Sequence, residues 1–181
     1  MKSENSSFLS RINSPSDLKS FNTKELLEIA FEIRELIVAT VSKNGGHLSA
    51  NLGAVDLTLA LHYVFDSPRD LLIWDVGHQC YAHKIVTGRK ESFYSLRRYQ
   101  GLSGFPNPAE SEHDHFISGH GSTAISQGLG CACARDILSQ NHKIIAIVGD
   151  ASLVGGMAFE ALNYLGHIQK DLLIVLNDNE W

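Results

Sequence analysis

Cysteine, proline, tryptophan and methionine are all scarce in this sequence of 181 residues, which contains three, four, two and two of them respectively. Three cysteines cannot all pair with one another. Cys131 and Cys133 lie two positions apart in a stretch with helical character, which turns them toward opposite faces. The composition therefore excludes a fold held together by disulfides and is typical of a protein whose thiols stay reduced and fill core space.

Long apolar runs and clusters of positive charge are missing as well. No apolar run reaches the roughly 18 residues of a membrane span, and the polar N-terminus lacks the apolar region of a signal peptide. The formal net charge is −5 and Lys and Arg form no dense run, which argues against a nucleic-acid surface. We therefore expect a cytoplasmic globular protein with no membrane and no nucleic-acid partner.

The N-terminal half of the sequence shows a helical pattern. Residues 1–20 predict a loose arm, and Asn22 or Thr23 begins a helix whose apolar residues recur at 26, 30, 33, 37 and 41 until "KNGGH" ends it. A second helix is expected over 54–65 and short helices over 80–100. Between them, a buried strand is expected over 71–76, delivering Gly77 and His78 at its end. The segment 101–116 reads as a long surface or site-lining loop.

The C-terminal half alternates strands with helices. A helix rich in small residues is expected over 122–139 and would allow close packing on a sheet. "KIIAIVGD" then predicts a strand, "GGMAFEALNYLGHI" a helix and "DLLIVLND" a second strand. Strands this apolar suit a parallel sheet whose faces are both covered. The sequence therefore predicts an α/β fold with a parallel sheet and helices on both of its faces.

Polar residues follow the predicted strands where ligands bind in such folds, outside the carboxyl ends of the sheet. Asp150 and Asn179 lie 29 positions apart, just enough for one helix and one strand, so their oxygens would come to neighbouring strand ends. A carboxylate and an amide oxygen suit a hard cation such as Mg²⁺. Helix N-termini at 151–152 and near 121–122 would aim free N–H groups at a phosphate. The residues alone thus predict a Mg²⁺-diphosphate site.

Longer motifs make the prediction more specific. "GDASLVGGMAFEALNYLGHIQKDLLIVLNDN" resembles the thiamine-diphosphate motif, and four further segments stand in order before it: "GGHLSANLG", "LIWDVGHQCYAHKIVTGR", "GLSGFPNPAESEHD" and "SGHGSTAIS". Together they resemble the 1-deoxy-D-xylulose-5-phosphate synthase family, transketolase-like enzymes of the non-mevalonate isoprenoid and thiamine pathways. The resemblance implies the thiamine-diphosphate-binding fold, thiamine diphosphate and Mg²⁺ as cofactors, a homodimer, and the condensation of pyruvate with D-glyceraldehyde 3-phosphate with loss of CO₂.

The resemblance also implies roles for matching positions. Asp150 and Asn179 would hold Mg²⁺ with the backbone carbonyl of Trp181, and Ala151 and Ser152 would contact the diphosphate. The remaining cofactor-lining positions, on the phosphate and thiazolium side, are His78, Gly119, His120 and Gly121. Under the same resemblance, His47 would reach the reacting centre and handle protons on the substrate.

Two positions depart from the family pattern. Ala151 replaces a Gly, at a cost on the order of 1 kcal/mol if the backbone there needs a positive φ and at none otherwise. Trp181 stands where the family usually has Met, and the sequence ends there, inside the metal-binding loop. The resemblance places the glutamate that activates the cofactor in a later domain. We therefore expect residues 21–181 to be a partial diphosphate-binding domain, incomplete at its C-terminus and inactive alone.

Other interpretations remain beside this one. The chain could be one subunit of a split enzyme or a non-catalytic remnant. Ser126 in "AISQG" resembles a variant of the nucleophile elbow of serine hydrolases, but no convincing strand precedes it. "HDH" at 113–115 lacks the further ligands of a metal hydrolase and is better explained as a solvated acidic loop. Glu160 and Glu180 are not expected to act as a pair.

Overall fold

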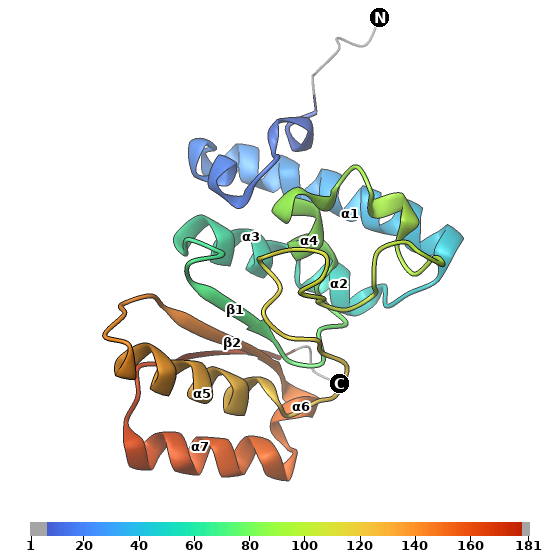
Figure 1. Ribbon diagram of the computed structural model, residues 1–181. Helices are drawn as coiled ribbons and strands as arrows, with labels where there is room; N and C mark the ends of the chain where they lie inside the picture. Colours follow the sequence, from blue (N-terminus) through green and yellow to red (C-terminus); the bar gives the residue numbers. More distant parts are fainter. Residues whose placement is uncertain (1–6, 179–181) are drawn as a thin grey trace, which may run out of the picture. The chain divides into compact units, whose positions relative to one another are not determined.

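The computed structural model describes residues 7–178 and divides into two compact units (Figure 1). The first unit contains the residues up to 66 and residues 80–104. The second unit contains residues 67–79 and those from 105 onward. Among residues 7–178, no helix is both long and apolar enough to span a bilayer.

The first unit is organised by the long helix α1 (Thr23–Asn44). The side-chain oxygen of Asn22 accepts hydrogen bonds from the N–H groups of Lys24 and Glu25 at 2.9 and 3.2 Å. The Glu25 carboxylate accepts one from the Asn22 N–H at 2.8 Å, which completes a capping box. Gly45 ends the helix with φ 76°, a conformation that glycine adopts without steric cost. Both ends of the predicted helix are thereby confirmed.

Short helical elements pack against α1. The predicted helix over 54–65 is confirmed within a residue as α3 (Val55–Val64), and a turn that the sequence did not predict, α2 (Ser49–Gly53), precedes it. The short helices expected over 80–100 are α4 (Tyr81–Lys84), η3 (Ile85–Arg89) and η4 (Phe93–Ser95). Buried isoleucines every four residues on α1 form the side that meets α3 and α4: Ile29, Ile33 and Ile37.

The expectation of a loose N-terminal arm is wrong for the described part of that segment. Two 3₁₀ elements, η1 (Leu9–Arg11) and η2 (Pro15–Ser20), bury Leu9 and Leu18. The Glu32 carboxylate accepts hydrogen bonds from the N–H groups that start η1, and the Lys90 ammonium donates to the carbonyls of Leu9, Ser10 and Ile12. Both partners are distant in sequence, so local composition could not show that they hold the segment.

The second unit is built on a parallel sheet of three strands, in the order β1 (Leu71–Trp74), β2 (Ile144–Gly149) and β3 (Leu173–Asn177). All three predicted strands are thus present, although β1 is shorter than expected. In the register, Trp74 lies opposite Ile147, and Gly149 lies opposite Asn177. The carboxyl ends of all three strands therefore meet at one edge of the sheet.

Helices α5 (Ala124–Ile137) and α7 (Gly156–Ile168) pack against each other on one face of this sheet, and the short α6 (Asp150–Leu153) follows β2 directly (Figure 1). Alternate residues of β2 enter the core that α5 and α7 cover: Ile144, Ala146 and Val148. A Cβ added to Gly128 of α5 would lie 2.9 Å from Leu172 Cδ1, so the small residue permits the close packing that the sequence predicted.

Candidate functional site

The carboxyl edge of the sheet carries an aspartate just after each strand. Asp75 follows β1, Asp150 follows β2 and Asp178 lies one residue beyond Asn177 of β3. Because Gly149 pairs with Asn177, Asp150 and Asp178 stand at equivalent positions on neighbouring strands. The predicted proximity of these two strand ends is therefore confirmed. Asn179 and Trp181, two of the three predicted metal ligands, lie outside the described residues.

Asp75 holds the beginning of α5 at this edge. Its carboxylate is buried and accepts hydrogen bonds from the N–H of Ser122 at 2.8 Å and from the N–H of Ala124 at 3.2 Å. A carboxylate at a helix N-terminus satisfies N–H groups that have no partner within the helix and complements the helix dipole. The expectation that N–H groups near 121–122 point freely at a phosphate is therefore wrong at Ser122, whose donor is already used.

Ser122 joins the loops of two strands. Its hydroxyl donates to the carbonyl of Ser152 at 2.6 Å, while its N–H is held by Asp75. A Cβ added to Gly155 would lie 2.0 Å from the Ser122 Oγ, and a Cβ added to Gly121 would lie 3.1 Å from the Ser152 Oγ. The segment that follows β2 and the segment that begins α5 are thus in close contact, and at Gly155 an added Cβ would also lie 2.8 Å from the Ser122 Cβ, so this position requires glycine.

A tight turn ends β1 and delivers His78. Val76 has φ 57° and Gly77 has φ 81°, and the Gly77 N–H approaches the Asp75 carbonyl at 2.5 Å. A positive φ is unusual for a β-branched residue and marks a backbone held under strain. A Cβ on Gly77 would lie 2.4 Å from Pro106 Cδ, so only glycine fits. This turn is why the strand stops at Trp74 instead of the expected Val76.

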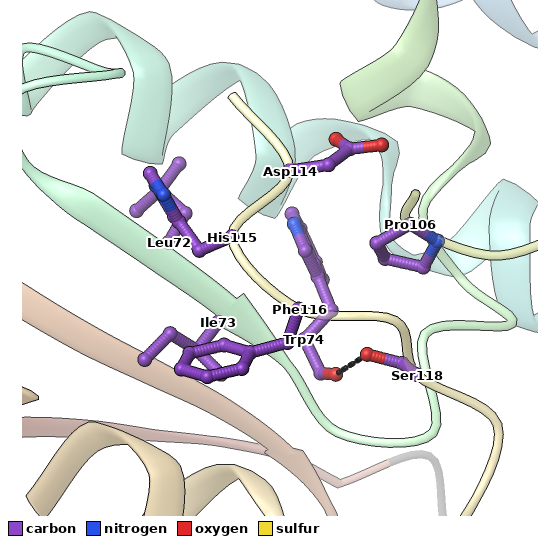
Figure 2. A pocket seen from close by; sticks show the side chains of 8 residues that line it. All are labelled: Leu72, Ile73, Trp74, Pro106, Asp114, His115, Phe116 and Ser118. Carbon is purple, nitrogen blue, oxygen red and sulfur yellow. Dashed lines mark hydrogen bonds between the residues drawn. The ribbon is translucent and has the colours of Figure 1, made fainter. Parts of the chain in front are cut away.

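The predicted turn at Gly119, His120 and Gly121 is exposed and borders the same edge. Its start is fixed by Ser118, whose hydroxyl donates to the Trp74 carbonyl at 3.3 Å, as Figure 2 shows. Its end is fixed by the contacts of Ser122. The His120 imidazole thus belongs to a loop that is anchored on both sides to the carboxyl end of β1.

The residues after β2 are arranged as a helical turn. Asp150, Ala151 and Ser152 all lie in α6, and Ala151 is not among the residues with a positive φ. The replacement of the family's glycine by Ala151 therefore imposes no left-handed strain. The Asp150 carboxylate is partly exposed at the start of this turn, where a hard cation could reach it.

His47 belongs to the first unit, on the loop between α1 and α2. Its side chain is exposed, and its backbone N–H donates to the Tyr81 hydroxyl at 3.4 Å. Its carbonyl accepts a hydrogen bond from the Asn51 side-chain nitrogen at 2.6 Å. The peptide groups on both sides of the residue are thus held, while the imidazole is left accessible.

Comparison with known proteins identifies the family of this chain. A family model described as 1-deoxy-D-xylulose-5-phosphate synthase matches residues 9–181. The chain belongs to this family. The curated synthase of Alkaliphilus oremlandii is 56% identical over 173 residues, which are 96% of this chain and 28% of that protein. The synthase of Heliobacterium modesticaldum is 58% identical over 172 residues, or 95% of this chain and 27% of that protein. The chain thus spans less than a third of these relatives.

Solved structures show the same fold. A transketolase from Leishmania mexicana superposes with a TM-score of 0.76 and 20% identity, covering 85% of this chain and 27% of that one. The transketolase from Campylobacter jejuni gives a TM-score of 0.74 at 23% identity, covering 88% of this chain and 29% of that one. At these identities the likeness concerns the fold alone, and it confirms the transketolase-like α/β architecture of the synthase family.

Sequence reasoning missed four residues of this synthase-family chain that position predicted site residues: Asp75, Ser122, Asn51 and Tyr81. Asp75 carried one available signal, because it directly follows a buried strand in the same motif as His78. Ser122 lies within the "SGHGSTAIS" segment, but only the fold reveals that it bridges two strands. The contacts of Asn51 and Tyr81 with His47 join different elements and have no local signature.

The "HDH" segment is not the solvated loop that the sequence suggested. Asp114 is buried and accepts a hydrogen bond from the Asn107 N–H at 2.7 Å, and His113 Nδ1 lies 2.9 Å from the Ser67 hydroxyl. Burial lowers the pKa of His115, an effect that the Asp114 carboxylate partly opposes. Within residues 7–178, no group of three or more His, Cys, Asp or Glu side chains is placed to hold a metal ion.

Neither of the other candidate sites gains support in this family fold. The cavity beside "HDH", which Trp74, Phe116 and His115 help to line in Figure 2, has a volume of about 10 Å³ and admits at most one water molecule. Ser126 is exposed in the first turn of α5 and does not follow a strand. It therefore lacks the strand-to-helix turn of a nucleophile elbow.

Proposed function

We propose that this chain forms the diphosphate-binding portion of a 1-deoxy-D-xylulose-5-phosphate synthase, a thiamine-diphosphate-dependent transferase of isoprene biosynthesis. The observation that carries the proposal is the carboxyl edge of the sheet in the second unit. There Asp150 starts α6 beside the end of β3, and the loop carrying His120 is tied to the same edge through Asp75 and Ser122. Membership in the synthase family supports this assignment of the reaction.

The residues at this edge fit the cofactor and its metal. The Asp150 carboxylate would hold Mg²⁺ together with the Asn179 amide and the Trp181 carbonyl, two groups that lie outside the described residues, and oxygen ligands of this kind are the ones that Mg²⁺ prefers. Ala151 and Ser152 would contact the diphosphate. Because Ala151 is small and exposed, the diphosphate could come close to the backbone there. His78, Gly119, His120 and Gly121 would line its phosphate and thiazolium side.

When bound, thiamine diphosphate supplies the nucleophilic carbon that protein side chains lack. The overall reaction would break the bond between the carboxylate and carbonyl carbons of pyruvate, release CO₂, and join the remaining two-carbon unit to the aldehyde carbon of D-glyceraldehyde 3-phosphate with the uptake of one proton. His47 would move protons on the substrates, since its exposed imidazole stands on a backbone held by hydrogen bonds on both sides. We propose that the complete synthase is a cytoplasmic homodimer.

The test is an assay of the complete protein encoded by the gene that contains this chain. With pyruvate labelled at its carboxyl group, release of labelled CO₂ should require D-glyceraldehyde 3-phosphate, thiamine diphosphate and Mg²⁺. Asp150→Asn should weaken activation by Mg²⁺, whereas Asp56→Asn, which alters an exposed pair with Arg34, serves as the control. Absence of any release that depends on the aldehyde would overturn the proposed reaction.

A further inference from the structure

The loop Gly45–His47 of the first unit rests on two fully buried polar side chains, Asn51 of α2 and Tyr81 of α4. Asn51 donates to the His47 carbonyl at 2.6 Å, and the Tyr81 hydroxyl accepts from the His47 N–H at 3.4 Å. The two side chains thus hold the peptide groups before and after the His47 α-carbon. His47 itself is exposed.

The two supports are also bonded to each other. The Asn51 side-chain oxygen accepts a hydrogen bond from the Tyr81 N–H at 2.9 Å, at the first residue of α4. The three hydrogen bonds close a ring that joins α2, α4 and the loop. The Tyr81 ring meets Phe93 edge-on, with centroids 5.9 Å apart and an interplanar angle of 69°, which fixes its orientation in the core.

Gly46 allows the hydroxyl to come this close. Its φ is 145°, and a Cβ at this position would lie 2.7 Å from the Tyr81 Oη. Burying a hydroxyl and an amide is unfavourable unless both find hydrogen-bond partners. Here the loop that carries His47 supplies part of those partners, so the core of the unit and the position of the loop are set together.

We propose that Asn51 and Tyr81 are positioning residues for His47 and keep its imidazole at a fixed place for proton transfer. The inference rests on the acid–base role of His47 in the proposed function. General acid–base catalysis depends on the placement of the group that carries the proton, and a displacement of about 1 Å can cost about a hundredfold in rate. A ring anchored in the core supplies that placement to an otherwise exposed residue.

The first test measures the loop directly in the complete synthase. Tyr81→Phe removes only the hydroxyl, so the exchange of the His47 amide proton with water, followed by mass spectrometry of the peptides that contain His47, should become at least about tenfold faster. Tyr99→Phe is the matched control, because Tyr99 is 93% exposed and the same atom is removed. Unchanged exchange of the His47 amide in Tyr81→Phe would overturn the inference.

The second test is a kinetic cycle in the complete synthase. Tyr81→Phe and Asn51→Asp, which replaces the donor to His47 while keeping the acceptor for Tyr81, should each lower kcat about 10- to 100-fold. KM and the affinity for thiamine diphosphate should change less than about threefold. In a His47→Ala background, Tyr81→Phe should have no further effect, whereas a merely structural role would lower activity equally in both backgrounds.

The outcomes separate this inference from the proposed function. If His47→Ala keeps full activity, the acid–base role of His47 and the positioning role both fail. If His47→Ala loses activity while Tyr81→Phe and Asn51→Asp keep normal kcat, only the positioning role fails. If the aldehyde-dependent release of CO₂ is absent from the unmodified synthase, the proposed reaction itself fails.

Discussion

Single residues at the carboxyl edge decide whether the site can form, and Gly77 is the clearest case. Its φ of 81° is unfavourable for any other residue, and a Cβ would meet Pro106 at 2.4 Å and Ser118 at 2.9 Å. We expect Gly77→Ala to lower the free energy of unfolding by more than about 2 kcal/mol, measured by urea denaturation.

The matched control for this substitution is Gly130→Ala. Gly130 lies within α5, where an added Cβ meets nothing within 4 Å. Alanine should stabilise the helix there by up to about 1 kcal/mol. Equal effects of the two substitutions would contradict the conclusion that the turn after β1 requires glycine.

His115 predicts a pH dependence. Burial lowers its pKa below the ordinary value of about 6.5, so the folded state binds this proton less readily than the unfolded state. The contribution of His115 to stability is therefore fully present above about pH 6.5 and is lost as the pH falls toward the lowered value. Thermal melts of His115→Leu should show a smaller loss of melting temperature between pH 7 and pH 5 than melts of the unmodified chain. Parallel pH curves for the two proteins would count against this assignment.

At the scale of elements, the N-terminus of α5 depends on Asp75. Because the buried carboxylate accepts from both Ser122 and Ala124, Asp75→Ala should destabilise the chain by about 1–3 kcal/mol and speed the exchange of both amide protons. Asp75→Asn keeps one acceptor oxygen, so its stability should lie between that of the unmodified chain and that of Asp75→Ala. Hydrogen exchange with NMR detection measures both effects.

Asp56→Ala is the control for the Asp75 prediction. Its carboxylate pairs with Arg34 at 2.7 Å but is largely exposed, and such surface pairs contribute less than about 1 kcal/mol. If removal of Asp75 left the Ser122 and Ala124 amides as protected as before, another group would have to hold the start of α5.

The sequence predicted elements where a local pattern carries the information. The capping box at Asn22 and Glu25 lies within four residues, and the apolar run of β2 reflects burial of the whole strand. A single helix joins the two predicted strands, so their carboxyl ends were expected to be neighbours, and Asp150 does lie beside the end of β3. The cofactor and residue roles came from resemblance to a family, and they remain predictions.

What the sequence could not predict depends on contacts between distant residues. The segment 9–20 is polar in composition, yet Glu32 and Lys90 hold it from positions more than 20 and 70 residues away. The Asp75 carboxylate accepts the hydrogen bond of the Ser122 N–H, which the sequence analysis expected to be available to a phosphate. The two residues are 47 positions apart, so no local pattern could show this contact. Asp114 is buried through its bond with Asn107, although its neighbours in sequence are polar.

At the scale of the whole molecule, the described residues leave apolar side chains exposed on β3 and on α7. Leu173 and Leu176 are about half exposed, as are Met157 and Phe159 of α7. Within the described part of the sheet, β3 pairs on one side only, and an open strand edge favours association. We expect the 181-residue chain to self-associate in size-exclusion chromatography with light scattering.

A charged residue on this surface should reduce the association. Leu176→Lys places a charge on β3 at a position that is already 50% exposed, so it should cost little stability while opposing edge-to-edge contact. A monodisperse monomer of the unmodified chain at high concentration would contradict the prediction. It would also show that this surface is tolerated in water without further protein over it.

The central claim is that the carboxyl edge of the second unit binds a diphosphate with Mg²⁺, and thermal unfolding of this chain with thiamine diphosphate tests it most directly. At a ligand concentration 100 times Kd, binding should stabilise the chain by about 2.7 kcal/mol, only when Mg²⁺ is present and not in Asp150→Ala. An unchanged melting temperature at millimolar cofactor with Mg²⁺, or an equal shift in Asp150→Ala, would contradict the claim.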